Sequence, residues 1–93
     1  MKINYRKEAR GRDCTVRIPG VCNRDSETVV LAHLPGGGMG RKRNDLHGCW
    51  ACSDCHNCLD GRVRTDYPAR ELRLWHLEAV IRTQEALIAE GKL

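Results

Sequence analysis

The sequence contains few aromatic residues and no long apolar segment. Its 93 residues include no phenylalanine, two tryptophans and two tyrosines. The chain can therefore bury only a thin core, and a cross-link would help to hold that core together. No run approaches the roughly 18 apolar residues of a membrane-spanning helix. The N-terminal stretch MKINYRKEARGRDC is charged throughout and lacks the apolar segment of a signal peptide. We expect one small domain, residues 1–93, in the cytoplasm.

Cysteine, in contrast, is abundant. The chain has six cysteines, four of them in the stretch CWACSDCHNC at residues 49–58. Disulfides do not persist in a reducing cytosol, so clustered cysteines there usually bind a metal. The segment CSDC has the spacing of a redox motif, but no parallel βαβ pattern surrounds it. A structural zinc site is the favoured interpretation, and a disulfide framework is the alternative.

The spacing of the cysteines indicates which of them bind the metal. A CxxC turn presents two sulfurs to one point, and a second pair flanks the turn at Pro19–Gly20. The predicted ligands of the zinc are Cys14, Cys22, Cys52 and Cys55. Cys49 and Cys58 also have a metal-binding spacing, and we treat them as small buried apolar residues.

Positive charge is concentrated in the first half of the chain. Residues 1–43 carry a net charge of +6 and residues 44–93 a net charge of −2. Such a basic half favours a polyanionic partner, with nucleic acid first, although a solvated surface is the alternative. The glycine-rich stretch LPGGGMGRKRN at 34–44 ends in three basic residues that we expect to contact phosphate. These are Arg41, Lys42 and Arg43.

The pattern of residues predicts a small α+β protein. We expect a short helix within 5–10, strands at 28–33 and within 45–52, and a helix from Asp54 to about Arg62 with Ser53 as its N-cap. A terminal helix begins after Asp66 and Pro68 and ends at Gly91. Its apolar stripe is predicted to pack on a core formed by residues 1–65, or alternatively to form a dimer. The stripe consists of Leu74, Leu77, Ile81 and Ile88, widened by Leu72, Trp75 and Leu87. Glu78 and Arg82 are expected to pair on the outside of this helix.

The order of a few polar residues resembles a known family. His33 ends a strand, Asn44 follows the glycine-rich loop, and His56 follows the CxxC turn. This order resembles the ββα-metal module of HNH endonucleases. The stretches RGRDCTVRIPGVCN, TVVLAHLPGGGMGRK and CSDCHNCLDGR are similar to the YbcO family of prophage-encoded "putative nucleases". The resemblance covers about residues 5–64 and includes no motif for the terminal helix.

The resemblance implies a zinc-stapled ββα-metal core, a C-terminal amphipathic helix and metal-dependent DNA hydrolysis by a phage or prophage protein. In its terms His33 is the general base, and His56 is a ligand of a second, catalytic divalent metal (Mg, Mn, Ni or Zn). Asn44 ties the loop and orients the base, although His47 is an alternative for that position.

The sequence departs from the HNH pattern at one position. The residue before the base is commonly a metal ligand in that family, and here it is Ala32. Asp60, four residues after His56 on the same helix face, is the expected substitute, and Asp45 is a second candidate. This departure keeps a non-catalytic, zinc-stabilised DNA-binding or protein-interaction module as the alternative. The sequence leaves open a monomer or a homodimer through the C-terminal helix, and it indicates no role for His76.

Overall fold

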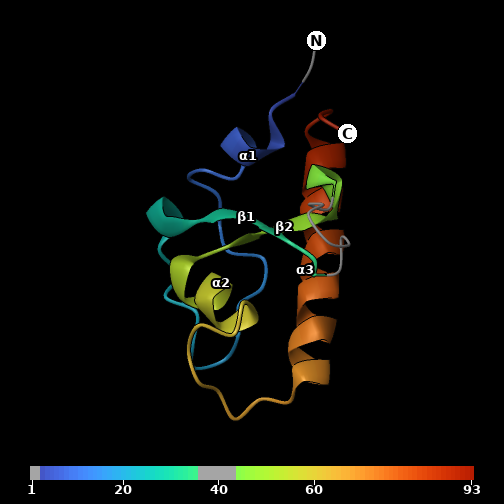
Figure 1. Cartoon of the computed structure of the whole chain (residues 1–93). Helices are drawn as coiled ribbons and strands as arrows, with labels where there is room; N and C mark the ends of the chain where they lie inside the picture. Colours follow the sequence, from blue (N-terminus) through green and yellow to red (C-terminus); the bar gives the residue numbers. More distant parts are fainter. Residues whose placement is uncertain (1–2, 36–43) are drawn as a thin grey trace.

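The chain folds into a two-stranded sheet flanked by helices, a small α+β arrangement (Figure 1). A computed structural model describes residues 3–35 and 44–93. The α-helices are α1 (Tyr5–Glu8), α2 (Ser53–Leu59) and α3 (Ala69–Ala89), and the strands are β1 (Val30–His33) and β2 (Gly48–Ala51). Two 3₁₀ helices precede the strands, η1 (Ser26–Thr28) before β1 and η2 (Asp45–His47) before β2. The basic residues at 41–43 lie outside the described residues.

The two strands form an antiparallel pair whose register places Val30 opposite Ala51 and His33 opposite Gly48. All four residues of β2 are buried, so this strand lies at the centre of the molecule. β1 begins two residues later than the sequence predicted. The side chain of Asp25 caps η1, and the Thr28 hydroxyl accepts a hydrogen bond from the Ser53 amide at 3.1 Å. Thr28 therefore ends a turn that connects to α2 instead of extending the strand.

α2 starts and ends earlier than the sequence predicted. Its N-cap is Cys52 and not Ser53, because the Cys52 sulfur accepts a hydrogen bond from the amide of Cys55 at 3.4 Å. The helix ends at Leu59, and Gly61 takes a φ of +75° just beyond it. A left-handed residue at this place ends a helix, and glycine adopts that conformation at little cost.

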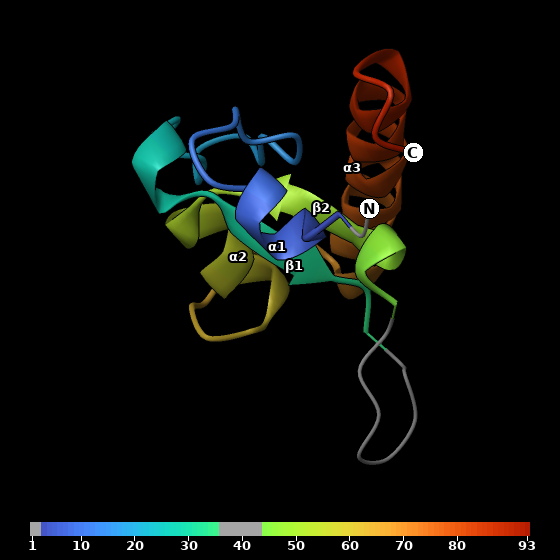
Figure 2. The ribbon, with the colours of Figure 1, turned by 90° about the horizontal axis from the view of Figure 1, so that it is seen from above.

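The bounds predicted for the terminal helix are confirmed. α3 begins directly after Pro68, and Gly91 adopts a φ of +73° beyond its last turn. The helix packs against β2, as both views of the ribbon show (Figures 1 and 2). The hydroxyl of buried Thr83 accepts a hydrogen bond from the Trp50 amide at 3.2 Å and lies 3.0 Å from the Thr15 hydroxyl. α3 thus supplies a hydrogen-bond acceptor to the backbone edge of β2 that is not paired with β1.

The packing face predicted for α3 is wrong for its four central residues. The large aliphatic residues of the expected stripe are between 44% and 58% exposed, namely Leu74, Leu77, Ile81 and Ile88. Of the residues that widen the stripe, Leu87 is buried, and Leu72 and Trp75 are partly buried against the core. The other buried residues of the helix are His76, Ala79, Val80 and Thr83. The unpaired backbone edge of β2 requires a hydrogen-bonding partner, and small side chains such as Ala79 let the helix approach closely. These two requirements decide which face of α3 packs on β2, although the other face has the larger apolar area.

Polar contacts join the two ends of the chain. The Tyr5 hydroxyl donates to the carbonyl of Lys92 at 2.7 Å. Arg12 pairs with Glu8 and Glu90, and its guanidinium lies 4.7 Å from the centre of the Trp50 ring. The outside pair predicted between Glu78 and Arg82 is not among the ion pairs of the described residues.

Within the described residues, no helix combines the length and apolar character needed to cross a membrane.

Candidate metal centre and candidate active site

Four cysteines from two distant segments meet beside the N-terminus of α2. The ligand atoms of Cys14, Cys22, Cys52 and Cys55 all lie within 4.8 Å of one another. Asn23 joins the two segments, since its side-chain amide donates to Ser53 and Asp54 at 3.1 Å each. The structure therefore brings together the four cysteines that the spacing indicated.

The geometry of the cluster fits a tetrahedral metal ion. Four sulfurs at about 2.3 Å from a zinc ion lie about 3.8 Å apart. The sulfurs of Cys22 and Cys52 are 3.8 Å apart. All the cysteines are free thiols and not disulfides. A hydrogen bond from Cys55 lowers the pKa of the Cys14 thiol to about 4, and the same bond raises the pKa of Cys55. A cation would let all four sulfurs become thiolates, so this cluster could hold a metal ion.

The other two cysteines lie outside the cluster. Cys49 and Cys58 are both almost completely buried in the apolar core. Burial raises the pKa of the Cys49 thiol far above its usual range, so this group stays a neutral thiol. Both residues act as small apolar residues in this fold.

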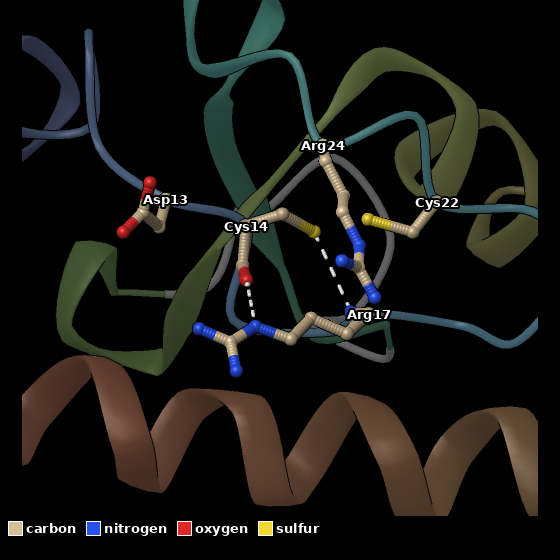
Figure 3. A pocket seen from close by; sticks show the side chains of 5 residues that line it. All are labelled: Asp13, Cys14, Arg17, Cys22 and Arg24. Atoms are coloured by element: carbon tan, nitrogen blue, oxygen red, sulfur yellow. Dashed lines mark hydrogen bonds between the residues drawn. The ribbon is translucent and has the colours of Figure 1, made fainter.

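Two arginines beside the cluster were not singled out by the sequence. Asp13, Arg17 and Arg24 line, with two of the cysteines, a hollow of about 310 Å³ (Figure 3). Arg17 and Arg24 have φ angles of 51° and 56°, in the left-handed region that costs a residue with a β-carbon about 1–2 kcal/mol. This conformation directs the amide of Arg17 at the Cys14 sulfur, 3.5 Å away. The turns around the sulfurs thus explain the left-handed backbone.

His33 lies at the end of β1 and is paired with Asp45 of η2. Its Nε2 is 2.7 Å from Oδ1 of Asp45. A carboxylate only accepts hydrogen bonds, so Nε2 carries the proton and Nδ1 of the neutral ring has the free lone pair. This bond from His33 lowers the pKa of Asp45, and Arg6, 3.5 Å from the same oxygen, lowers it further. Asp45 therefore stays ionised and sets the tautomer of His33.

Asn44 shapes the short segment that carries Asp45. Its side chain accepts a hydrogen bond from the Leu46 amide at 2.9 Å, and its carbonyl accepts one from the His47 amide at 2.8 Å. The His47 carbonyl in turn accepts from the amide of Leu34, one residue beyond β1. Asn44 thus caps η2, whose last residue is hydrogen-bonded to the chain beyond His33. His47 itself is exposed.

His56 and Asp60 form a second pair on α2. The Nε2 of His56 is 3.2 Å from Oδ2 of Asp60, which caps the C-terminus of the helix. Both side chains are partly exposed. Imidazole nitrogen and carboxylate oxygen are ligands that divalent metals accept, and a metal ion would take the place of the proton on Nε2.

His76 is the polar residue that the sequence analysis missed. It is buried on α3, and its Nε2 is 2.9 Å from the carbonyl oxygen of Ala32. The charges that act on its imidazole include those of Asp60, His56 and His33. His33 and the His56–Asp60 pair therefore act electrostatically on one buried ring. The signal in the sequence is the spacing of His76 from Ala79 and Thr83, which marks a second, less apolar helix face.

Known proteins share this arrangement over nearly the whole chain. A family model described as "Putative nuclease YbcO" matches residues 3–92. Relatives from Escherichia coli strain K12 and Enterobacteria phage 82, both named "Putative nuclease YbcO" apart from capitalisation, are 46% identical over 91 residues, which is 95% of this chain and 94% of theirs. A solved structure, "Structure of a putative bacteriophage protein from Escherichia coli str. K-12 substr. MG1655", is 45% identical with a TM-score of 0.81. It covers 95% of this chain and 100% of its own. The matches include α3, for which the sequence alone offered no motif.

Proposed function

The chain belongs to the YbcO family, and from this premise we propose that it is a metal-dependent DNA endonuclease of the HNH type. The observation that carries this proposal is the pairing of His33 with Asp45 at 2.7 Å, at the end of a strand that packs against α2, the helix that carries the His56–Asp60 pair. One pair offers an oriented base, and the other offers two ligands for a divalent metal. Similar proteins from a bacterium and from a phage both carry a nuclease name. Their sources support the proposal that this chain is a phage or prophage protein that acts in the bacterial cytoplasm.

We propose that β1, β2 and α2 form a ββα-metal core stapled by zinc and that the whole chain is one domain. The order of elements supports this proposal, because β1 ends in His33, β2 returns antiparallel, and α2 carries His56. Cysteine sulfurs with tetrahedral spacing favour zinc over harder cations. The zinc would link the segment before β1 to the start of α2 and so contribute directly to folding.

The proposed chemistry assigns one task to each side chain. His33, protonated on Nε2, uses Nδ1 to take a proton from the attacking water. Asp45 stabilises the imidazolium that forms, and Asn44 holds η2 so that Asp45 stays in place. His56 and Asp60 would hold a divalent cation (Mg, Mn, Ni or Zn), and such a cation would supply positive charge to neutralise the leaving oxygen.

A cleavage assay with matched histidine variants tests the proposal. Supercoiled, linear, single-stranded and branched DNA would be incubated with Mg²⁺, Mn²⁺, Ni²⁺ or Zn²⁺. His33→Ala should lower the rate by about 10²–10⁴, the usual contribution of a general base. His56→Ala should abolish cleavage through loss of the exchangeable metal. His47→Ala changes an exposed histidine of the same region and tests the alternative for the middle position; the rate should stay unchanged if Asn44 holds that position.

Two outcomes of this assay would contradict the proposed nuclease activity. Cleavage that survives in both His33→Ala and His56→Ala points to a contaminant. Binding without cleavage over the whole panel favours a non-catalytic, zinc-stabilised DNA-binding or protein-interaction module. The small side chain of Ala32, directly before His33, is the observation that favours this second candidate.

We also propose that Arg41, Lys42 and Arg43 contact the phosphates of the DNA. The support is their charge and the glycines before them, which let a backbone approach a rigid polyanion. Neutralising all three should weaken binding to every DNA sequence and reduce the salt slope by up to about 0.9 per lost contact. Neutralising Arg64, Arg70 and Arg73 is the control for total charge. If neutralising Arg41, Lys42 and Arg43 leaves the salt slope unchanged, these residues do not contact the phosphates.

Finally, we propose that two copies of the chain associate through the exposed apolar stripe of α3. The stripe comprises Leu74, Leu77, Ile81 and Ile88, each between 44% and 58% exposed. Successive members are three, four and seven residues apart, which is the spacing of the seam between two paired helices. Contiguous exposed apolar residues of this kind usually mark an interaction site. A monomer leaves the stripe in water and is the alternative.

A further inference from the structure

A second hollow lies between α3 and the segment that precedes β1. It has a volume of about 280 Å³ and is lined by Val16, Arg17, Pro19, Trp75 and Arg82. Arg17 also lines the hollow beside the cysteine cluster, so the two hollows are neighbours that share one wall. The lining combines an indole ring and apolar surface with two cationic groups and contains no carboxylate. This composition suits a ligand that has both a flat ring and a negative charge.

The two arginines are held in place without being neutralised. Nε of Arg17 donates to the carbonyl of Cys14 at 3.0 Å, and Nη1 of Arg82 donates to the carbonyl of Thr15 at 2.6 Å. Neither arginine takes part in the ion pairs found among residues 3–35 and 44–93. Each guanidinium has five N–H donors, so most of them remain available to an anion after one is used on the backbone. The backbone bonds also reduce the rotamer freedom that binding would otherwise remove.

The indole ring of Trp75 is also oriented by its neighbours. The Tyr67 ring meets it nearly at right angles (80°), with the ring centres 4.9 Å apart. Tyr67 is itself anchored, because its hydroxyl donates to the carbonyl of Pro19 at 2.8 Å. Trp75 remains partly exposed, whereas Trp50 is buried. A partly exposed and oriented indole is a surface on which a planar ring can stack.

We propose that this hollow binds one unpaired nucleotide of a single-stranded nucleic acid. The base stacks on Trp75, and the adjoining phosphate binds Arg17 and Arg82. A base inside a duplex is covered on both faces, so it cannot enter such a hollow unless it is unpaired. Aromatic stacking combined with arginine–phosphate contacts is the usual chemistry of single-strand binding. The proposal rests on nucleic acid being the ligand of the proposed function, and it names unpaired strands as the substrate class.

Arg24 extends the same line of positive charge. It lines the hollow on the other side of Arg17, and its side chain reaches between Cys14 and Cys22 in the view of Figure 3. A strand whose base occupies the hollow beside Trp75 could present a neighbouring phosphate to Arg24, because the two hollows share Arg17. Arg17 and Arg24 also lie beside the cysteine cluster and could serve only to balance the negative charge of its sulfurs when a metal is bound. Arg82 lines the hollow beside Trp75 and not the one beside the cysteines. A variant of Arg82 therefore distinguishes phosphate binding from charge balance at the cluster.

Binding measurements without added divalent metal test the proposal independently of cleavage. The zinc-loaded protein would be titrated with oligo(dT) and with a duplex of equal length, while tryptophan emission and the anisotropy of a labelled strand are followed. We expect oligo(dT) to quench the emission and to bind more tightly than the duplex. Trp75→Phe should keep the tight binding and lose the quenching. Trp75→Leu should weaken single-strand binding about tenfold, the usual effect of removing one stacking platform, and leave duplex binding unchanged.

The arginine variants separate phosphate binding from general charge. Arg82→Gln should weaken oligo(dT) binding and reduce its salt slope by about 0.7, the value for one phosphate contact on a single strand. Arg73→Gln removes the same charge from an exposed position on the same helix, lines neither hollow, and should have a smaller effect. Thermal melting and zinc content would be measured for each variant. If Trp75→Leu does not fold, the comparison of Trp75→Phe with the parent still reports whether the ring contacts the strand.

The results distinguish this proposal from the nuclease assignment. Absence of quenching, or equal affinity of the parent for oligo(dT) and duplex, contradicts nucleotide binding in the hollow, even if the protein cuts DNA. Equal effects of Arg82→Gln and Arg73→Gln also overturn it. If the protein cuts no DNA but shows quenching that depends on Trp75, nucleotide binding in the hollow is supported and the nuclease activity is contradicted.

Discussion

His76 donates a hydrogen bond from Nε2 to the carbonyl oxygen of Ala32, the residue directly before His33, over 2.9 Å. A carbonyl only accepts, so Nε2 carries the proton and the neutral ring has its lone pair on Nδ1. The bond joins the middle of α3 to β1 across 44 residues of sequence. The terminal helix is thereby connected to the strand that ends in the proposed base.

We predict that His76 makes the stability of the protein depend on pH. Burial lowers its pKa below the usual value of about 6.5. Below that value the unfolded chain binds a proton that the folded chain does not, so the free energy of unfolding falls as the pH drops. One such group contributes a slope of up to about 1.4 kcal/mol per pH unit until the pH reaches the folded pKa. His76→Gln should remove this part of the slope below about pH 6.5.

Denaturant unfolding of the parent and His76→Gln over this pH range checks the prediction. Loss of metal from the cysteines at low pH affects both proteins equally, so the difference between the two curves isolates His76. Parallel curves would show that His76 is not kept neutral by the fold.

We predict that the protein binds about one zinc ion per chain through Cys14, Cys22, Cys52 and Cys55. Cys52→Ser should lose the metal and unfold, because metal binding and folding are one equilibrium in such sites. Cys49→Ala is the matched control and should retain the zinc, since Cys49 is buried outside the cluster. Elemental analysis and circular dichroism check both variants. Purified protein without zinc, or with stoichiometric disulfides, contradicts the prediction.

We predict that Asp45→Asn lowers the rate of DNA cleavage by at least about tenfold, because an amide does not hold His33 in a single tautomer as a carboxylate does. Asp66→Asn removes an exposed carboxylate elsewhere and should leave the rate unchanged. Single-turnover cleavage at saturating metal is the appropriate measurement, since it separates chemistry from metal affinity. A normal rate in Asp45→Asn would remove Asp45 from the mechanism.

The two faces of α3 should respond differently to charge. Ile81→Glu changes the exposed stripe, and we expect it to convert a dimer into a stable monomer. Ala79→Glu places a carboxylate on the fully buried face and should unfold the chain, because an unpaired charge there has no partner. Light scattering and thermal melting distinguish these results. A parent that is monomeric at high concentration would contradict the dimer.

Local chemistry made several features of this protein predictable from the sequence. Pro68 and Gly91 bound α3, because one favours the first turn of a helix and the other adopts the left-handed conformation beyond its end. The spacing of Cys52 and Cys55 predicted two sulfurs facing one point, and that prediction is confirmed within the cluster. These signals depend on the backbone preferences and reach of residues a few positions apart.

Only the tertiary structure decided which residues meet across the chain. The central residues of the apolar stripe of α3 are exposed against prediction, because β2 needs a polar partner that Thr83 provides and a close approach that Ala79 allows. Asp45 meets His33, and Arg82 turns to Thr15 instead of pairing with Glu78, four residues away on its own helix. Such contacts join segments that are distant in sequence. Their geometry is set by how the sheet and helix pack, which periodicity along a single chain does not encode.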